Sequence, residues 1–254
     1  MSANKSKAKV VVKTCGIRTV DAAIAATEAG ADIIGVIFAV SGRQIDIGKA
    51  QEIAQAIRQT CSTEDAVLSA SAIRQGIDPT ASVSEYFQAC TSRMLNSSRP
   101  LLAGVFQNQP LDHILHVARM VPLDLVQLHG KEPVDMAEKI PVPVIKVFHV
   151  DDQFSLESSD LFTTFQHSIV LLDTKVAGTD QQGGKGVSFD WTLARKLADR
   201  GVPFLMAGGL TPDNVATAAE VGGAWGVDVS SGIETNKAKD VGKIKAFVNN
   251  AKGI

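Results

Sequence analysis

The chain has 254 residues, of which 45% are hydrophobic and 20% charged, and its formal net charge at pH 7 is −2. This balance is typical of a globular protein and argues against wholesale disorder or a small disulfide-stapled scaffold. The near-neutral charge excludes a global electrostatic attraction to nucleic acid or to an anionic membrane, so any phosphate binding needs a local arrangement.

The N-terminal segment, Met1 to Lys9, contains three lysines but no apolar stretch of the kind that a secretory signal has. We expect a short disordered tail there. No apolar run in the chain approaches the roughly 20 residues of a membrane span. The three cysteines, Cys15, Cys61 and Cys90, lack metal-type spacing, which makes a disulfide framework or a zinc site unexpected. A cytoplasmic protein without a metal fits best.

In chain order, short β-branched runs alternate with longer segments whose apolar residues repeat at helical spacing. Eight runs are too short for typical helices and are predicted to be strands: Val10–Cys15, Ile33–Phe38, Leu101–Phe106, Leu125–Leu128, Val144–Val147, Ile169–Asp173, Phe204–Ala207 and Gly226–Val229. Helices are predicted at Val20–Ala29, Gly48–Gln59, Leu111–Met120, Val134–Ile140, Trp191–Arg200, Pro212–Val221 and Val241–Ala251. This alternation predicts one parallel sheet, closed into a single (β/α)8 TIM barrel over residues 10–254.

Two stretches depart from this alternation. Residues 61–100 are rich in Ser, Thr and Ala and form a predicted insertion between the second helix and the third strand. Because long structureless connections are uncommon in compact domains, we expect short helices such as Glu64–Ile73 and Val83–Met94, with the rest packed on the surface or disordered. The insertion is expected outside the barrel and away from the catalytic rim. A fifth helix is expected within Asp152–Phe165, although its serines lower the helix propensity.

Ligands of parallel barrels bind at the C-terminal ends of the strands, where loops can vary on a fixed frame. Polar or glycine-rich segments stand at six such ends: Lys13-Thr14-Cys15-Gly16, Ser41-Gly42-Arg43, Gln127-Leu128-His129-Gly130, Leu172-Asp173-Thr174, Ala207-Gly208-Gly209 and Asp228-Val229-Ser230-Ser231-Gly232. This set predicts an active site at that face of the barrel, with Asp228 among the residues that bind substrate.

The last two of these segments favour a phosphate site. Gly208 and Gly209 precede a helix, and Ser230, Ser231 and Gly232 follow the final strand. Both loops offer approachable backbone N–H donors, and barrel enzymes often hold phosphate after strands seven and eight. Either loop alone could equally be a tight turn that needs glycine. Their occurrence together favours phosphate.

Four side chains at the rim suggest proton transfer and substrate orientation. Alone, Cys15 could be a packing residue and Asp173 a cap, but their shared position at the rim suggests a general base and a general acid. Arg43 is predicted to orient a substrate carboxylate, with an ordinary surface arginine as the alternative. His129 could carry a proton, although a neutral hydrogen-bonding wall residue is the favoured role.

Five ordered sequence blocks resemble the phosphoribosylanthranilate isomerase family. They are Val12-Lys13-Thr14-Cys15-Gly16-Ile17, Val126-Gln127-Leu128-His129-Gly130, Leu171-Leu172-Asp173-Thr174 with Gly183-Gly184-Lys185-Gly186 and Phe189-Asp190-Trp191, Ala207-Gly208-Gly209-Leu210-Thr211-Pro212-Asp213-Asn214-Val215, and Gly226-Val227-Asp228-Val229-Ser230-Ser231-Gly232-Ile233-Glu234. The resemblance covers nearly the whole chain except the insertion. The glycines at 183–186 match no P-loop spacing and are interpreted as a mobile cover of the site.

The resemblance implies an Amadori rearrangement of N-(5-phosphoribosyl)anthranilate to the 1-deoxyribulose product in tryptophan biosynthesis, without a cofactor. It also implies that Cys15 is the general base, that Asp173 is the general acid and that Arg43 contacts the anthranilate carboxylate. The glycine and serine loops would hold the phosphate. The chain departs from the family at Thr14, where Ile is frequent, and at Gly42, where Pro is frequent. Gly42 should leave the Arg43 loop less rigid.

Two other functions compete with isomerisation. Indole-3-glycerol phosphate synthase, another phosphate-binding barrel enzyme, is expected to need a catalytic lysine and glutamates, and Lys13 and Lys146 are candidate lysines. A non-catalytic barrel that binds a phosphorylated metabolite would need no acid–base pair. Cys15 with Asp173 fits isomerisation better than either. The sequence is compatible with a monomer or a homodimer acting on a small phosphorylated substrate.

Overall fold

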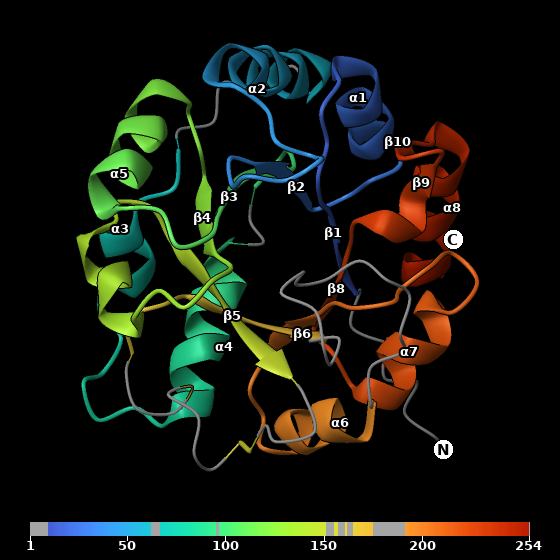
Figure 1. Cartoon of the computed structure of the whole chain (residues 1–254). Coiled ribbons are helices and arrows are strands. Elements are labelled where there is room, and N and C mark those ends of the chain that lie inside the picture. Colours follow the sequence, from blue (N-terminus) through green and yellow to red (C-terminus); the bar gives the residue numbers. More distant parts are fainter. Residues whose placement is uncertain are drawn as a thin grey trace.

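The computed structural model describes residues 10–61, 67–94, 97–150, 155–156, 161, 165–174 and 191–253. Its centre is a closed barrel of eight parallel strands, each paired with the next and the last paired with the first (Figure 1). The strands are β1 (Val11–Thr14), β2 (Ile33–Ile37), β3 (Leu101–Phe106), β4 (Leu125–Leu128), β5 (Val144–Val150), β6 (Ile169–Thr174), β7 (Phe204–Met206) and β8 (Gly226–Val229). The predicted (β/α)8 barrel is confirmed, and three strands have the predicted bounds.

Helices surround this barrel (Figure 1). They are α1 (Val20–Glu28), α2 (Ile47–Cys61), α3 (Ala70–Arg74), α4 (Val83–Met94), α5 (Leu111–Met120), the 3-10 helix η1 (Val134–Lys139), α6 (Trp191–Asp199), α7 (Val215–Gly222), the 3-10 helix η3 (Ser231–Ile233) and α8 (Val241–Lys252). A two-stranded antiparallel ribbon, β9 (Glu234–Thr235) with β10 (Ala238–Lys239), precedes α8. Within the described ranges, no helix combines the length and the apolarity needed to span a membrane.

The strands are buried on both faces, which explains why their sequences read as apolar runs rather than as alternating patterns. Helices pack over the outside with small or branched side chains; α1, for example, buries four alanines. Its first turn is capped by Thr19, whose hydroxyl accepts from the backbone N–H of Ala22. Rigid strands surrounded in this way hold the rim residues in fixed directions.

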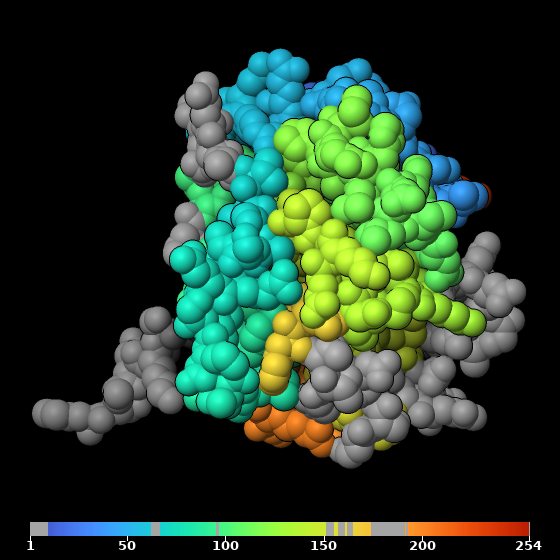
Figure 2. All heavy atoms as spheres, turned by 90° about the vertical axis from the view of Figure 1, so that its left-hand side faces the viewer, coloured from blue at the N-terminus to red at the C-terminus, as the bar shows by residue number. Residues whose placement is uncertain are grey.

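The segment between α2 and β3 is more than a surface addition. Helix α4 lies outside β5 and β6, between η1 and α6 (Figure 1), and the segment forms part of the outer wall of the molecule (Figure 2). Its Phe87 is fully buried and its ring contacts the ring of His167, just before β6. Ser84 donates to the carbonyl of Gly201, before β7. The segment therefore contributes to the hydrophobic core near the N-terminal ends of these strands.

Three local predictions need correction. The pattern of Val134–Ile140 predicts an ordinary helix, but η1 is a 3-10 helix that follows Pro133. The helix expected from Pro212 begins at Val215, because residues 212–214 form a turn in which Asn214 bonds back to the carbonyl of Gly209 and the N–H of Thr211. The helical piece expected from Glu64 is present only as α3.

Other predictions cannot be compared. The N-terminal tail, the glycines at 183–186 and most of the expected fifth helix lie outside the described residues.

Candidate active site

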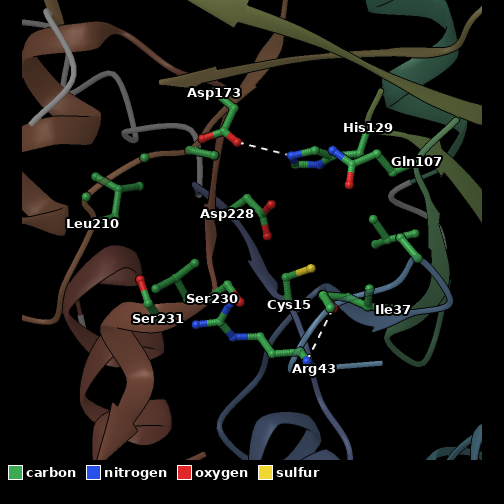
Figure 3. Close-up of a pocket in the computed structure, with 17 residues that line it drawn as sticks. Cys15, Ile37, Arg43, Gln107, His129, Asp173, Leu210, Asp228, Ser230 and Ser231 are labelled. Carbon is green, nitrogen blue, oxygen red and sulfur yellow. Dashed lines mark hydrogen bonds and ion pairs between the residues drawn. The ribbon is translucent and has the colours of Figure 1, made fainter. Parts of the chain in front are cut away.

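A pocket opens at the C-terminal ends of the strands and is drawn in Figure 3. Nine of the ten predicted site residues line it: Cys15, Arg43, His129, Asp173, Gly208, Gly209, Asp228, Ser230 and Ser231. Cys15 and Asp173 lie on opposite sides of the pocket in this view, with Asp228 between them. A substrate held there would have a thiol on one side and a carboxyl group on the other.

The thiol of Cys15 lies directly beyond the end of β1, beside a buried ion pair. Lys13 and Asp228 are register partners on β1 and β8, so both side chains point the same way. The Lys13 ammonium donates to an Asp228 carboxylate oxygen over 2.9 Å. Gly35 on β2 leaves room for the thiol, because an added Cβ would lie 2.8 Å from its sulfur. A small residue on β2 is therefore required by the position of Cys15.

Burial and charge act in opposite directions on Cys15. Burial raises the pKa of the thiol, Lys13 lowers it and Asp228 raises it, so that the net pKa lies above the ordinary value. Burial also disfavours the charge of Lys13, but Asp228 and Cys15 together hold the pKa of this ammonium above its ordinary value. Lys13 thus stays charged and is the main group that favours the thiolate.

Asp173 is held by a histidine on the neighbouring rim. Nε2 of His129 lies 3.2 Å from a carboxylate oxygen of Asp173, and this contact is drawn in Figure 3. Nδ1 of His129 lies 2.7 Å from the side-chain amide nitrogen of Gln127, which donates to it. The proton of the neutral ring is then on Nε2, pointing at Asp173. His129 therefore orients the carboxyl group, consistent with the wall role expected from the sequence.

A second histidine stands beside this pair. His149 is the register partner of Asp173 on β5, and its ring packs edge-on against that of His129, with centroids 5.3 Å apart. Burial, together with His129, lowers the pKa of His149, which keeps its ring neutral. Among the described residues, His129, His149 and Asp173 form the one group whose side-chain donors are arranged to hold a metal ion.

Arg43 is fixed by an acidic partner from the other end of the chain. Its Nε and Nη2 donate to the two carboxylate oxygens of Glu234, over 2.6 and 2.9 Å. Lys239 lies 2.9 Å from the same carboxylate. Burial opposes the charge of Glu234, but hydrogen bonds from Arg43 and Lys239 lower its pKa to about 2. Nη1 of Arg43 is left for a ligand.

The loop before Arg43 is also anchored, although Gly42 replaces the proline frequent in the resembling family. The carbonyl of Gly42 accepts from the guanidinium of Arg18 over 2.8 Å, and the backbone N–H of Arg43 donates to the Ser41 hydroxyl. Side-chain hydrogen bonds thus supply part of the rigidity that a proline would give.

The two loops of the expected phosphate site lie against each other. Gly208 and Gly209 have φ values of +98° and +64°, a region that only glycine adopts without strain. Gly232 does not line the pocket, but an added Cβ there would meet the carbonyl oxygen of Leu210 at 1.9 Å. Gly232 is therefore required for the close approach of the loops after β7 and β8, and Ser231 lines the pocket beside them.

Sequence reasoning missed three side chains of this site. His149 lies two residues beyond the predicted end of its strand. Glu234 stood in a quoted motif, but its contact with Arg43 spans 191 positions, which no local pattern reveals. Gln107, just after β3, lines the pocket and lies near His129 in Figure 3. The position of Gln107 directly after a strand was the one signal that could have identified it.

Comparison with known proteins gives a consistent result. Residues 58–250 match the family model of N-(5'-phosphoribosyl)anthranilate (PRA) isomerase. An N-(5'-phosphoribosyl)anthranilate isomerase of Komagataella pastoris is 39% identical over 95% of this chain and 99% of its own. A multifunctional tryptophan biosynthesis protein of Phycomyces blakesleeanus is 40% identical over 97% of this chain. The chain spans about a third of the length of that multifunctional protein, 33%.

Solved structures agree. The crystal structure of phosphoribosyl anthranilate isomerase from Thermotoga maritima has a TM-score of 0.71 and 32% identity, covering 96% of this chain and all of the other. A structure of this isomerase in complex with reduced 1-(o-carboxyphenylamino)-1-deoxyribulose 5-phosphate has a TM-score of 0.68 and 31% identity, with the same coverage.

Proposed function

This chain belongs to the N-(5'-phosphoribosyl)anthranilate isomerase family, and we propose that its pocket performs that isomerisation by general acid–base catalysis with Asp173 as acid and Cys15 as base. The observation that carries the proposal is the position of these two groups on opposite sides of one pocket. A general acid and a general base must reach different atoms of the sugar, which such a placement permits.

The first step opens the sugar ring. The carboxylic acid of Asp173 gives its proton to the furanose ring oxygen, the bond from that oxygen to C1 breaks, and the anilino nitrogen supplies the electron pair that forms the imine. His129 orients the carboxyl group for this transfer through its 3.2 Å contact. Asp173 is left as a carboxylate, and the substrate becomes an open-chain protonated imine.

The second step moves hydrogen from C2. The Cys15 thiolate removes the C2 proton, and the C–H electron pair forms the C1–C2 double bond of an enamine. This enamine tautomerises by protonation at C1 and loss of the hydroxyl proton at C2, which gives the ketone. C2 is oxidised and C1 is reduced within one molecule, so the reaction needs no external electron acceptor. The proposed class is therefore a cofactor-independent intramolecular oxidoreductase.

Two further groups of residues would hold the substrate. Arg43, fixed by Glu234 with Nη1 left for a ligand, fits the anthranilate carboxylate. The phosphate fits the loops after β7 and β8, where Gly208, Gly209 and Ser231 line the pocket. Asp228 and Ser230 complete the wall between these two ends. The two anions of the substrate would thus be bound at separate points, with the sugar held between Cys15 and Asp173.

The indole-3-glycerol phosphate synthase alternative fits the pocket less well. Lys13 is fully buried in its contact with Asp228, and Lys146 donates to the carbonyl of Gly130 on the rim. Neither ammonium lines the pocket. A monomer or a homodimer is compatible with the proposal, and sedimentation of the pure protein would distinguish them.

Mixing the pure protein with freshly generated phosphoribosylanthranilate tests the function. We expect rapid loss of the substrate's fluorescence, with formation of the deoxyribulose product. A rate equal to the spontaneous background would remove the proposal.

A further inference from the structure

His149 is not needed by the chemistry above, yet it completes an unusual set of donors. Each of His129, His149 and Asp173 offers one ligand atom within 4.8 Å of the others. They come from the ends of three successive strands, β4, β5 and β6, whose rigid pairing fixes their spacing. His129 and Asp173 also line the pocket, which gives a solute access to the group.

The hydrogen bonding of His149 leaves one ring nitrogen free for a ligand. Its Nε2 lies 3.0 Å from the backbone carbonyl of His129, and a carbonyl only accepts, so Nε2 carries the proton. Nδ1 then has a lone pair, and it is buried without a hydrogen-bond partner among the described residues. A histidine whose second ring N–H is held by a carbonyl is the usual arrangement of a metal ligand.

His129 can present its own nitrogen after a simple rearrangement. Its Nδ1 is bonded to the amide of Gln127, while the amide oxygen of Gln127 has no partner among the described residues. Rotating the amide by half a turn lets that oxygen accept from Nδ1–H, and Nε2 then carries the lone pair. The proton stays on the ring, and the same heavy-atom positions serve both states.

The geometry matches a transition metal. Tetrahedral Zn²⁺ with bonds of about 2.0–2.2 Å to nitrogen and oxygen separates its ligand atoms by roughly 3.3 Å. Nε2 of His129 and the Asp173 oxygen are 3.2 Å apart. Two imidazoles and one carboxylate are a donor set that suits zinc better than Mg²⁺ or Ca²⁺, which prefer oxygen. Small side-chain movements of His149 would close the third edge.

We propose that His129, His149 and Asp173 form an inhibitory site for a divalent transition metal ion of the zinc class. Resting on the proposed function, the inhibition follows because a metal bound to the Asp173 carboxylate prevents its protonation, and the ring oxygen of the substrate then receives no proton. His149 distinguishes the two roles of the cluster, since it belongs to the metal site and does not line the substrate pocket.

Zinc titration of the purified enzyme tests the site. Micromolar Zn²⁺ should inhibit isomerisation by the parent, and a chelator should restore the rate. His149→Asn should keep the basal rate and need at least about 10-fold more zinc for half inhibition, as is typical when one metal ligand is lost. His149→Gln provides a second replacement if the first misfolds. His116→Asn, on the exposed face of α5, is the matched control and should behave as the parent.

Direct binding separates this proposal from the catalytic one. Calorimetric titration with Zn²⁺ should give one site in the parent and weaker binding in His149→Asn, whether or not the protein isomerises the substrate. Co²⁺ bound in place of zinc should show no thiolate charge-transfer band, because Cys15 is not a ligand. Equal zinc affinity in the parent and in His149→Asn would overturn the site. A thiolate band in the cobalt spectrum would do the same.

Discussion

The ion pair beneath Cys15 sets how much thiolate the enzyme holds, and the double variant Lys13→Met/Asp228→Asn tests this. Replacing both members avoids leaving one charge buried alone, which is typically the damaging change. Lys13 lowers the pKa of Cys15 and Asp228 raises it, with the lysine as the larger influence. Removing both therefore leaves the burial effect less opposed, and the pKa of the thiol should rise.

The magnitude follows from the opposing charges. One nearby opposite charge typically moves a pKa by 1 to 3. Because the opposing effect of Asp228 is lost together with that of Lys13, we expect a net rise of about 1. A base acts only when deprotonated, so below the pKa of the thiol this rise lowers the thiolate fraction, and with it kcat, about 10-fold. The loss should disappear once the pH exceeds the thiol pKa of both proteins.

The assay compares initial rates of fluorescence loss at saturating substrate from neutral to alkaline pH. Ultraviolet titration of thiolate in a Cys61→Ser/Cys90→Ala background reports the pKa of Cys15 directly. Asp228→Asn alone serves as the control for any lost substrate contact. An unchanged thiol pKa in the double variant would refute the role given to Lys13.

Three further predictions concern the rest of the site and its support. Glu234→Gln should raise KM about 10-fold while kcat changes little, because the amide no longer fixes the guanidinium of Arg43 by charged hydrogen bonds; equal KM values in steady-state kinetics would contradict this. Ser231→Asp should weaken the binding of inorganic phosphate and of product analogues by like-charge repulsion, whereas Ser231→Ala should have a smaller effect; unchanged inhibition constants for Ser231→Asp would exclude a phosphate site there. Phe87→Ala should lower the free energy of unfolding by about 3–5 kcal/mol, since the ring is fully buried, and a denaturant melt within about 1 kcal/mol of the parent would show that α4 is not part of the core.

Much of the fold was predictable because its signal is local. Leu101–Phe106, Leu125–Leu128 and Gly226–Val229 are strands with the predicted bounds, since a strand buried on both faces is an uninterrupted apolar run. Cys15 and Asp173 could be placed at one rim because the ends of parallel strands meet there.

The remainder depends on contacts between distant segments. The pairing of Glu234 with Arg43 joins the last rim loop to the second, and sequence spacing carries no information about it. Helix α4 was predicted with its observed bounds, but its packing against the wall outside β5 and β6 was not, because Ser and Thr on its outer face hide the buried Phe87. His149 was missed because β5 continues three residues past its predicted end at Val147.

The most direct test of the central claim is the turnover of Asp173→Asn and Cys15→Ser beside that of the parent. Positioned acids and bases typically contribute on the order of 10² to 10⁴ in rate. Each variant should lose at least the lower of these in kcat while still binding the product analogue, because the proposed phosphate and carboxylate contacts remain. Folding is checked in both by thermal melting. Near-parental kcat in both folded variants would contradict the assignment of Asp173 as acid and Cys15 as base.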